Sequence, residues 1–259
     1  MKLFAFTLDL EADYAGVINE EHILKDLTKI EEVLTALNSL DVKITVFTVG
    51  EIFDRFPKVI SLFEKYECEF EPHSYSHNFD HPDSEIEIIK AKEAYLNYFK
   101  KTPKGYRAPR GKISDSGINN LEKHGFLYDS SIFPSFFPNP FKYLLVNRGP
   151  HYFGNSNILE IPFTSISPFR LTLSISYIKL FGLNFYKFIK LPDIVCFGSH
   201  LHDFIIEENS FNRIPLIWKF IYSHNKYKGI DYCRKFLEHV KHEGYRFCYM
   251  SEIYDLYKR

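Results

Sequence analysis

The sequence predicts an α/β protein with one barrel-like domain, in which parallel strands alternate with helices. Short apolar runs rich in β-branched and aromatic residues alternate with amphipathic stretches, as they do in β/α units. A chain of 259 residues has a usual length for one α/β barrel, and 45% hydrophobic residues suffice for one large core. No internal repeat or low-complexity tract divides the chain, so we expect a single domain over residues 1–259.

The first quarter of the chain predicts two strands and two helices. Strands are expected at 2–10, "KLFAFTLDL", and at 43–50, "KITVFTVG", because both are short apolar runs. A helix is expected near 50–65, and another over 22–40, where apolar residues recur on one face. That face consists of Ile23, Leu27, Ile30, Leu34 and Leu37.

The same alternation continues to the end of the chain. A third strand is predicted at 68–74, "CEFEPHS", and a helix over 84–101. Ser84 and Glu87 have the spacing of a capping box, so we expect them to begin this helix. A fourth strand is predicted to end within 105–111, "GYRAPRG", and further strands are predicted at 126–131, 157–163, 193–202 and 245–250, with helices near 114–124 and 229–243.

Two segments depart from the alternation. Four prolines interrupt "PSFFPNPFKYLLVNRGPHYFG", which predicts an inserted loop near 134–155. Residues 171–191 are rich in apolar and aromatic side chains and include Lys179, Lys187 and Lys190. This pattern fits a peripheral contact with a membrane surface, and a helix that covers the barrel or a dimer contact explains it equally well. The segment is too polar for a transmembrane span.

Composition limits the classes of partner. The chain has 32 Lys and Arg against 33 Asp and Glu, so no global field attracts a polyanion, and we expect no nucleic-acid partner. The four cysteines are far apart and form no CxxC pair, which favours reduced core thiols over a zinc knuckle. The first residues, "MKLFAFTLDLEADY", lack the pattern of a secretory signal, so a cytoplasmic protein is expected.

Unusual polar residues stand at the ends of several predicted strands. The carboxyl ends of parallel strands are where barrels of this class assemble their chemistry, so these residues are candidates for one common site. They are Asp9 and Glu11 after the first strand, His73 and His77 after the third, Arg107, Asp129 and His202.

The first pair is Asp9 and Glu11. Lone acids at a strand exit are commonly ordinary surface residues. A spacing of two residues, however, sends both carboxylates to the same side of an extended chain. One of them can then bind a cation while the other serves as a base.

The histidines His73, His77 and His81 follow one another at intervals of four. A single helical turn would bring the rings of His73 and His77 to one face, where they could bind a divalent ion. Pro82 restricts the backbone of His81 and argues against a helix there. Two histidines and one carboxylate leave coordination positions open for water and substrate, as hydrolysis requires.

Arg107 lies in "YRAPRG", which predicts a tight turn after the fourth strand. It could be a surface cation, but a guanidinium beside Asp9 would favour the ionised carboxylate and hold it in place. A backbone N–H exposed in this turn, that of Arg110, could donate to a developing oxyanion.

His202 is a candidate general acid, with Asp129 as the carboxylate that orients its ring. His200 lies two residues earlier in an extended segment and faces the same way, so it is an alternative for the same role.

Five stretches in order along the chain resemble the polysaccharide deacetylase family, also called the NodB-homology or carbohydrate esterase family 4 domain. They span the chain from residue 3 to about 203, and their order and spacing make the set more specific than any one of them. The stretches are "TLDLE", "HSYSH", "RAPRG", "YDSSIF" and "LHD".

The resemblance implies a distorted (β/α) barrel of the NodB-homology type that holds a divalent ion, zinc first, with cobalt, nickel or manganese as alternatives. It implies hydrolysis of an N-acyl group, mainly N-acetyl, from an amino sugar. Carried over by position, Glu11, His73 and His77 would hold the metal, Asp9 would be the base with Arg107 as its partner, and His202 would be the acid tuned by Asp129.

This chain departs from the family pattern as a divergent branch would. Leu10 separates Asp9 from Glu11 where the family has adjacent aspartates, so Asp13 is an alternative ligand. Phe133 stands where tryptophan is expected, and His200 where leucine is expected. These departures affect the choice of substrate more than the chemistry.

A carbohydrate is therefore the expected partner. A cytoplasmic enzyme would meet lipid-linked or nucleotide-linked sugar precursors rather than mature wall polymer. Two other functions remain open: hydrolysis of another C–N bond, such as a formamide or a cyclic amide, and a carbohydrate-binding module without turnover.

Overall fold

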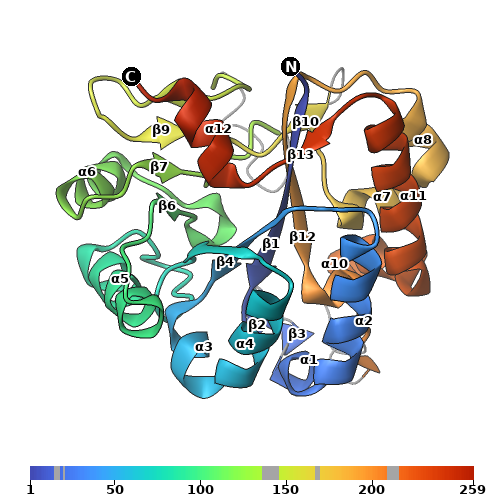
Figure 1. Cartoon of the computed structure of the whole chain (residues 1–259), viewed down its shortest axis with the longest axis horizontal. Coiled ribbons are helices and arrows are strands. Elements are labelled where there is room, and N and C mark those ends of the chain that lie inside the picture. Colours follow the sequence, from blue (N-terminus) through green and yellow to red (C-terminus); the bar gives the residue numbers. More distant parts are fainter. Residues whose placement is uncertain (15–17, 20, 136–145, 167–169, 209–215) are drawn as a thin grey trace.

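The computed structural model describes residues 1–14, 18–19, 21–135, 146–166, 170–208 and 216–259, and shows the distorted (β/α) barrel (Figure 1). Its largest sheet has the strand order β12-β1-β4-β5, with β13 also paired to β1, and all of these pairings are parallel. The strands are β1 (Leu3–Leu10), β4 (Ile44–Thr48), β5 (Glu69–Pro72), β12 (Ile194–His200) and β13 (Arg246–Phe247).

A second sheet continues the barrel wall in the order β6-β7-β9-β8, and only β8 runs antiparallel to its neighbour. The amide of Arg107 donates to the carbonyl of Pro72 at 3.1 Å, which joins the two sheets after β5. On the other side the amide of Thr164 donates to the carbonyl of Cys196 in β12 at 3.0 Å. The strands of this sheet are β6 (Gly105–Tyr106), β7 (Tyr128–Asp129), β8 (His151–Tyr152) and β9 (Leu159–Glu160).

Most of the helices lie outside the wall, whereas the last one, α12 (Met250–Tyr257), lies across one end of the strands and packs against Leu3 and Ala5 of β1 (Figure 1). The other helices are α1 (Glu21–Lys25), α2 (Leu27–Asn38), α3 (Gly50–Arg55), α4 (Pro57–Lys65), α5 (Glu85–Phe99), α6 (Asp115–Lys123), α7 (Ile175–Phe181), α8 (Leu183–Lys187), α10 (Leu216–Ser223) and α11 (Gly229–His242). Short 3-10 turns are η1 (Pro109–Gly111), η2 (Leu201–Asp203) and η3 (Lys226–Lys228). Two small antiparallel pairs are β2 (Asp13–Tyr14) with β3 (Ile18–Asn19), and β10 (Ser165–Ile166) with β11 (Leu171–Thr172).

The predicted alternation is confirmed, and two predicted helices are each divided in two. The stretch 22–40 breaks at Asp26, whose carboxylate accepts from the amide of Lys29 at 3.2 Å and so caps α2. The stretch 50–65 breaks at Phe56, because Pro57 occupies the first turn of α4, where a proline needs no amide partner.

The two faces of β1 separate the apolar core from the polar site. The strand is buried throughout, and its side chains alternate between two faces. Phe4 and Phe6 pack outward in the cluster that includes residues of α2 and α11, whereas Leu3 and Ala5 face a second cluster with residues of β9 and β12. Residues 7, 9 and 11 continue that second face, so it turns from apolar to polar toward the carboxyl end of the strand.

The structure describes only part of the predicted loop near 134–155, but all of the apolar segment 171–191. Of the inserted loop predicted near 134–155, residues 136–145 lie outside the described part, and β8 occupies two of the rest. The segment 171–191 contains β11, α7 and α8. Among the described residues, no helix is long and apolar enough to cross a membrane.

Candidate active site

Asp9 and Glu11 lie at the carboxyl end of β1 and on the same face, as their spacing predicts. Both are buried, with exposed fractions of 7% for Asp9 and 2% for Glu11. Buried carboxylates need charged or hydrogen-bonding partners, because an unpaired buried charge is costly. The partners here come from three other strand ends.

The loop after β5 brings His73 and His77 together, with ring centroids 5.3 Å apart. The predicted helical turn is wrong: residues 73–77 form an irregular loop in which Ser74 and His77 have left-handed backbone, at φ of 56° and 57°. His81, the last histidine of the series, is exposed.

Glu87 holds this loop. Its carboxylate accepts from the amides of Tyr75 and Ser76 at 3.0 and 2.9 Å, and from the hydroxyl of Ser76 at 2.8 Å. The predicted capping box is therefore wrong, since Ser84 makes no side-chain cap and Glu87 points to the loop instead. An acidic residue of α5 thus shapes the segment that presents both histidines.

Glu11, His73 and His77 offer ligand atoms that all lie within 4.8 Å of one another. Oε2 of Glu11 is 2.7 Å from Nε2 of His77 and 3.8 Å from Nε2 of His73. Nδ1 of His73 lies 2.8 Å from the carbonyl of Arg107, a bond in which the ring nitrogen must donate. Nε2 of His73 then carries the lone pair, which is the usual arrangement of a metal-binding imidazole. This buried set of two nitrogens and one carboxylate suits a divalent ion such as zinc.

The electrostatics of Glu11 agree with a cation site. Burial alone would raise the pKa of this carboxyl. The charge of His77 and hydrogen bonds to both histidines outweigh burial and lower the pKa of Glu11 well below its ordinary value. The carboxylate is therefore ionised and available as a ligand.

Arg107 lies beside Asp9, as predicted. Its Nη1 donates to Oδ1 of Asp9 at 2.6 Å, and its side chain is only 1% exposed. The guanidinium lies between the rings of Phe47 and Phe163, 3.8 and 4.1 Å from their centroids. Nε also donates to the carbonyl of Ser130 at 2.9 Å, so the guanidinium is fixed on every side. Only one oxygen of Asp9 is held in this way.

The other oxygen, Oδ2 of Asp9, faces histidines from two strands. It lies 3.7 Å from Nε2 of His200 and 4.0 Å from Nε2 of His73. Nε2 of His200 is also 3.8 Å from Oε1 of Glu11. Nε2 of His200, one of the two candidate acids, therefore faces both carboxylates.

His200 has an orienting carboxylate other than the predicted Asp129. Asp203 accepts from the amide of His200 at 3.0 Å, and its Oδ2 lies 3.8 Å from Nδ1 of the ring. Burial disfavours a charged imidazole, but the hydrogen bond to Asp203 and the charges of Glu11 and Asp9 raise the pKa of His200 to about 9. The aspartate of "LHD" was a visible signal, because it stands three residues from His200 at the start of η2.

His202 and Asp129 occupy different surroundings. The ring of His202 stacks on His200 at 5.0 Å and meets Tyr222 edge-on at 5.2 Å. Asp129 accepts from the hydroxyl of Ser131 at 2.7 Å and interacts electrostatically with the buried carboxyl of Glu160. The carboxylate grouped with His202 is Asp203, so the predicted pair of His202 and Asp129 does not form.

Two further predictions stay open. The side chain of Arg110 is exposed and lies over the ring of Phe79 at 4.2 Å, while its amide as an oxyanion donor remains a prediction. Asp13, the alternative ligand, belongs to β2, and its side chain lies outside the described part.

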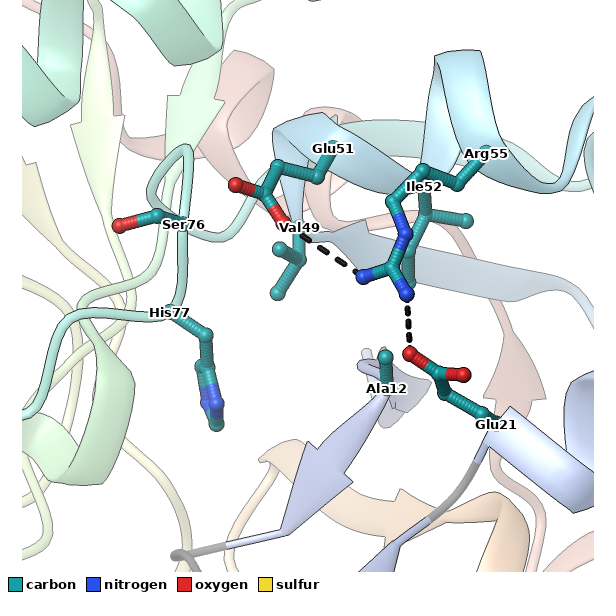
Figure 2. Close-up of a pocket in the computed structure, with 8 residues that line it drawn as sticks. All are labelled: Ala12, Glu21, Val49, Glu51, Ile52, Arg55, Ser76 and His77. Carbon is teal, nitrogen blue, oxygen red and sulfur yellow. Dashed lines mark hydrogen bonds and ion pairs between the residues drawn. The ribbon is translucent and has the colours of Figure 1, made fainter.

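A small cavity of about 160 Å³ adjoins the candidate metal ligands. Figure 2 shows His77 across the cavity from Arg55, which forms ion pairs with Glu21 and Glu51. The cavity is lined by Ala12, Glu21, Val49, Glu51, Ile52, Arg55, Ser76 and His77. The lining therefore combines charged side chains with apolar ones.

Comparison with known proteins agrees with the motifs. The family model described as "Polysaccharide deacetylase" matches residues 25–128, a range that includes His73, His77 and Arg107. Asp9, Glu11 and the strand β12 lie outside the matched range. A search of curated proteins finds no match.

Solved structures share the fold over nearly the whole chain. A Mycobacterium smegmatis protein assigned as a polysaccharide deacetylase is 18% identical, with a TM-score of 0.63 over 98% of this chain and 90% of that one. Puue allantoinase has a TM-score of 0.63 at 14% identity, over 97% and 89%. A family 4 acetyl xylan esterase from Clostridium thermocellum, in complex with a cobalt ion, is 18% identical with a TM-score of 0.53, over 98% and 91%. At these identities the likeness concerns the fold, and the resemblance predicted from the motifs is confirmed.

Proposed function

From its membership of the polysaccharide deacetylase family, we propose that this chain is a metal-dependent hydrolase that removes an N-acyl group, mainly N-acetyl, from an amino sugar. The observation that carries the proposal is the convergence of Glu11, His73 and His77 beside Oδ2 of Asp9, the oxygen that Arg107 does not bind. This arrangement combines a ligand set that leaves coordination positions open with an adjacent base.

Glu11, His73 and His77 would hold the ion, with zinc as the first choice and cobalt, nickel or manganese as alternatives. Such an ion polarises an acyl carbonyl and lowers the pKa of bound water. The cobalt in the similar acetyl xylan esterase supports a divalent ion in a barrel of this fold.

Asp9 acts as the base. Arg107 binds Oδ1 and leaves Oδ2 directed at the histidines, so Oδ2 is the atom that accepts the proton of the attacking water. The buried guanidinium keeps the carboxylate in one orientation. The amide of Arg110 is the proposed donor to the oxyanion that forms on the acyl oxygen.

His200 acts as the acid that protonates the departing nitrogen. We select it over His202 because its Nε2 lies within 4 Å of both Asp9 and Glu11, at 3.7 and 3.8 Å. The products are a free amine on the sugar and the carboxylate of the acyl group. Proposed substrates are amino sugars in saccharides or in lipid-linked or nucleotide-linked precursors.

The deciding experiment measures bound metal and acetate release together. The purified protein should bind one divalent ion per chain and release acetate from N-acetylated amino sugars. Asp9→Asn should keep the ion and lose activity by about 100-fold or more, because a general base contributes that much. His73→Ala and His77→Ala should lose the ion itself.

A second candidate is hydrolysis of another C–N bond, which the shared fold with Puue allantoinase favours. A panel of N-acetyl sugars, formamides and cyclic amides separates the two functions. Metal binding without turnover of any member would contradict both and indicate a carbohydrate-binding module.

A further inference from the structure

Helix α7 contains a buried lysine. Lys179 is only 1% exposed, whereas Lys187 and Lys190 of the same apolar segment are exposed. A fully buried lysine is rare unless its ammonium group has partners, because the loss of hydration must be compensated. The partners of Lys179 therefore indicate its role.

These partners belong to Asp203, the carboxylate beside His200. Nζ of Lys179 donates to the carbonyl of Asp203 at 3.0 Å and lies 3.9 Å from Oδ1 of its side chain. Ser176, one turn earlier on α7, donates its hydroxyl to the same Oδ1 at 2.6 Å. One face of α7 thus binds Asp203 through both its main chain and its side chain.

Asp203 is confined from a second direction. Its carbonyl oxygen packs so closely against Gly229, the first residue of α11, that a Cβ there would lie 2.0 Å from it. Asp203 itself is fully buried. Its position is therefore set by α7 on one side and by α11 on the other.

Oδ2 of Asp203 is directed at His200, and this connects α7 to the site. Oδ2 accepts from the amide of His200 and faces Nδ1 of the ring, while Nε2 of the ring faces Asp9 and Glu11. A continuous series of contacts therefore leads from Lys179 through Asp203 to the nitrogen that faces the carboxylates.

The cluster of His200, His202 and Asp203 has ligand atoms within 4.8 Å of one another, so a second metal ion is the alternative explanation. The ammonium of Lys179 already lies 3.9 Å from Oδ1 of Asp203 and supplies a positive charge. A divalent ion next to this buried cation would be repelled. The position of Lys179 therefore argues against a second ion at this cluster.

We propose that Lys179 is a positioning residue that, through Asp203 and together with Ser176, holds His200 in the orientation for proton donation. The inference rests on the proposed hydrolysis. In that reaction, water adds to the acyl carbon, the C–N bond breaks, and the nitrogen takes its proton from Nε2 of His200. The products are an amine and a carboxylate.

The dependence on the leaving group tests this role. An amide nitrogen must be protonated to leave, whereas 4-nitrophenolate leaves from 4-nitrophenyl acetate without a proton. Lys179→Met should lower kcat on an N-acetylated amino sugar by about 10-fold or more, with KM unchanged, since a misplaced acid loses part of its contribution. The rate on 4-nitrophenyl acetate should change by less than about 2-fold.

Lys190→Met is the matched control, because it removes an exposed lysine from the same segment and should leave both rates unchanged. If Lys179→Met does not fold, Ser176→Ala removes one hydrogen bond to Asp203 and should show the same selective loss. Long-range ¹H–¹⁵N spectra of the metal-free protein give a readout apart from activity. The ring signals of His200, assigned with His200→Gln, should shift in Lys179→Met and not in Lys190→Met.

The outcomes separate the inference from the proposed function. Equal loss on both substrates, or no loss on either, overturns the role of Lys179 while the activity of the unaltered protein upholds the hydrolase. Failure of the unaltered protein to release acetate refutes the proposed function, and the inference falls with it. A second tightly bound ion in the unaltered protein also contradicts the inference.

Discussion

Glu87 accepts hydrogen bonds from the amide and the hydroxyl of Ser76, the residue that precedes His77, at 2.9 and 2.8 Å. A helix residue that is not itself a candidate ligand therefore determines the backbone of the loop that carries two of them. Two other residues of that loop, Ser74 and His77, have left-handed backbone, which is unfavourable for residues other than glycine and needs support from the surrounding contacts.

Glu87→Ala should weaken metal binding by about 10- to 100-fold, because partners that orient metal ligands contribute about this much to affinity. Competition titration with a zinc chelator measures the change. Glu93→Ala alters an exposed acid of the same helix and should leave the affinity unchanged. Equal affinities in both variants would exclude a role for Glu87 in the metal site.

Arg107→Met should reduce the free energy of unfolding by about 3–5 kcal/mol, because it leaves the buried carboxylate of Asp9 without its ion-pair partner. Denaturant titration measures the loss. Arg234→Met removes an exposed arginine, paired with Glu238 on α11, and should change stability by less than about 1 kcal/mol. A similarly small effect of Arg107→Met would contradict the structural account of this ion pair.

The buried carboxyl pair of Glu160 and Asp129 predicts a stability that falls as pH rises. Both carboxyl groups are fully buried, so a charge on one disfavours ionisation of the other. Burial, followed by the charge of Asp129, raises the pKa of Glu160 well above its ordinary value of 4.5. The folded protein therefore keeps a proton that the unfolded chain releases.

The stability from this proton is fully present below pH 4.5 and is lost as pH rises toward the folded-state pKa. The difference in unfolding free energy between the unaltered protein and Glu160→Gln should fall by up to about 1.4 kcal/mol per pH unit. Urea titrations of both proteins measure this difference from pH 5 to pH 8, a range of about three units above the ordinary pKa of a glutamate. A difference that does not vary with pH would show that the pair carries no such proton.

Gly229→Ala should destabilise the protein, although alanine normally favours a helix by about 1 kcal/mol over glycine. The reason is that the added Cβ would lie 2.0 Å from the carbonyl of Asp203. Thermal unfolding measures the change. An unaltered or raised melting temperature would mean that α11 and Asp203 can move apart at little cost.

Peripheral membrane contact through residues 171–191 remains a prediction. The structure changes which residues can contribute to it: Lys179 is buried, while Phe188 is 90% exposed and Lys187 and Lys190 are exposed. Flotation with anionic liposomes should be weakened by Phe188→Ser and unaffected by Leu256→Ser, which alters an exposed apolar residue of α12. Absence of flotation for the unaltered protein would refute the contact.

The sequence was most informative where a residue acts through its position along a strand. The alternation of Thr7, Asp9 and Glu11 along β1 is a local property, and the strand ends that meet at one edge follow from the parallel order. The alternation of strands and helices and the gathering of these strand-end residues could therefore be predicted from the order of residues, whereas the assignment of Glu11 as ligand and Asp9 as base came from the resemblance to the family.

Features set by contacts between distant segments could not be predicted in this way. The spacing of Ser84 and Glu87 fits a capping box, and only the fold shows that the loop of His73 and His77 competes for the same carboxylate. The sequence also did not show that Asp203, rather than Asp129, is the partner of the proposed acid. That partnership depends on how α7 and α11 pack around η2.

The register of β1 and β12 places Asp9 directly opposite His200. The candidate metal ligands, together with Glu87 and Arg107, which orient them, all precede β12 in the chain, whereas the proposed proton donor, His200, ends that strand. During synthesis, the proposed pair of Asp9 and His200 can therefore form only after β12 has been translated and has paired with β1.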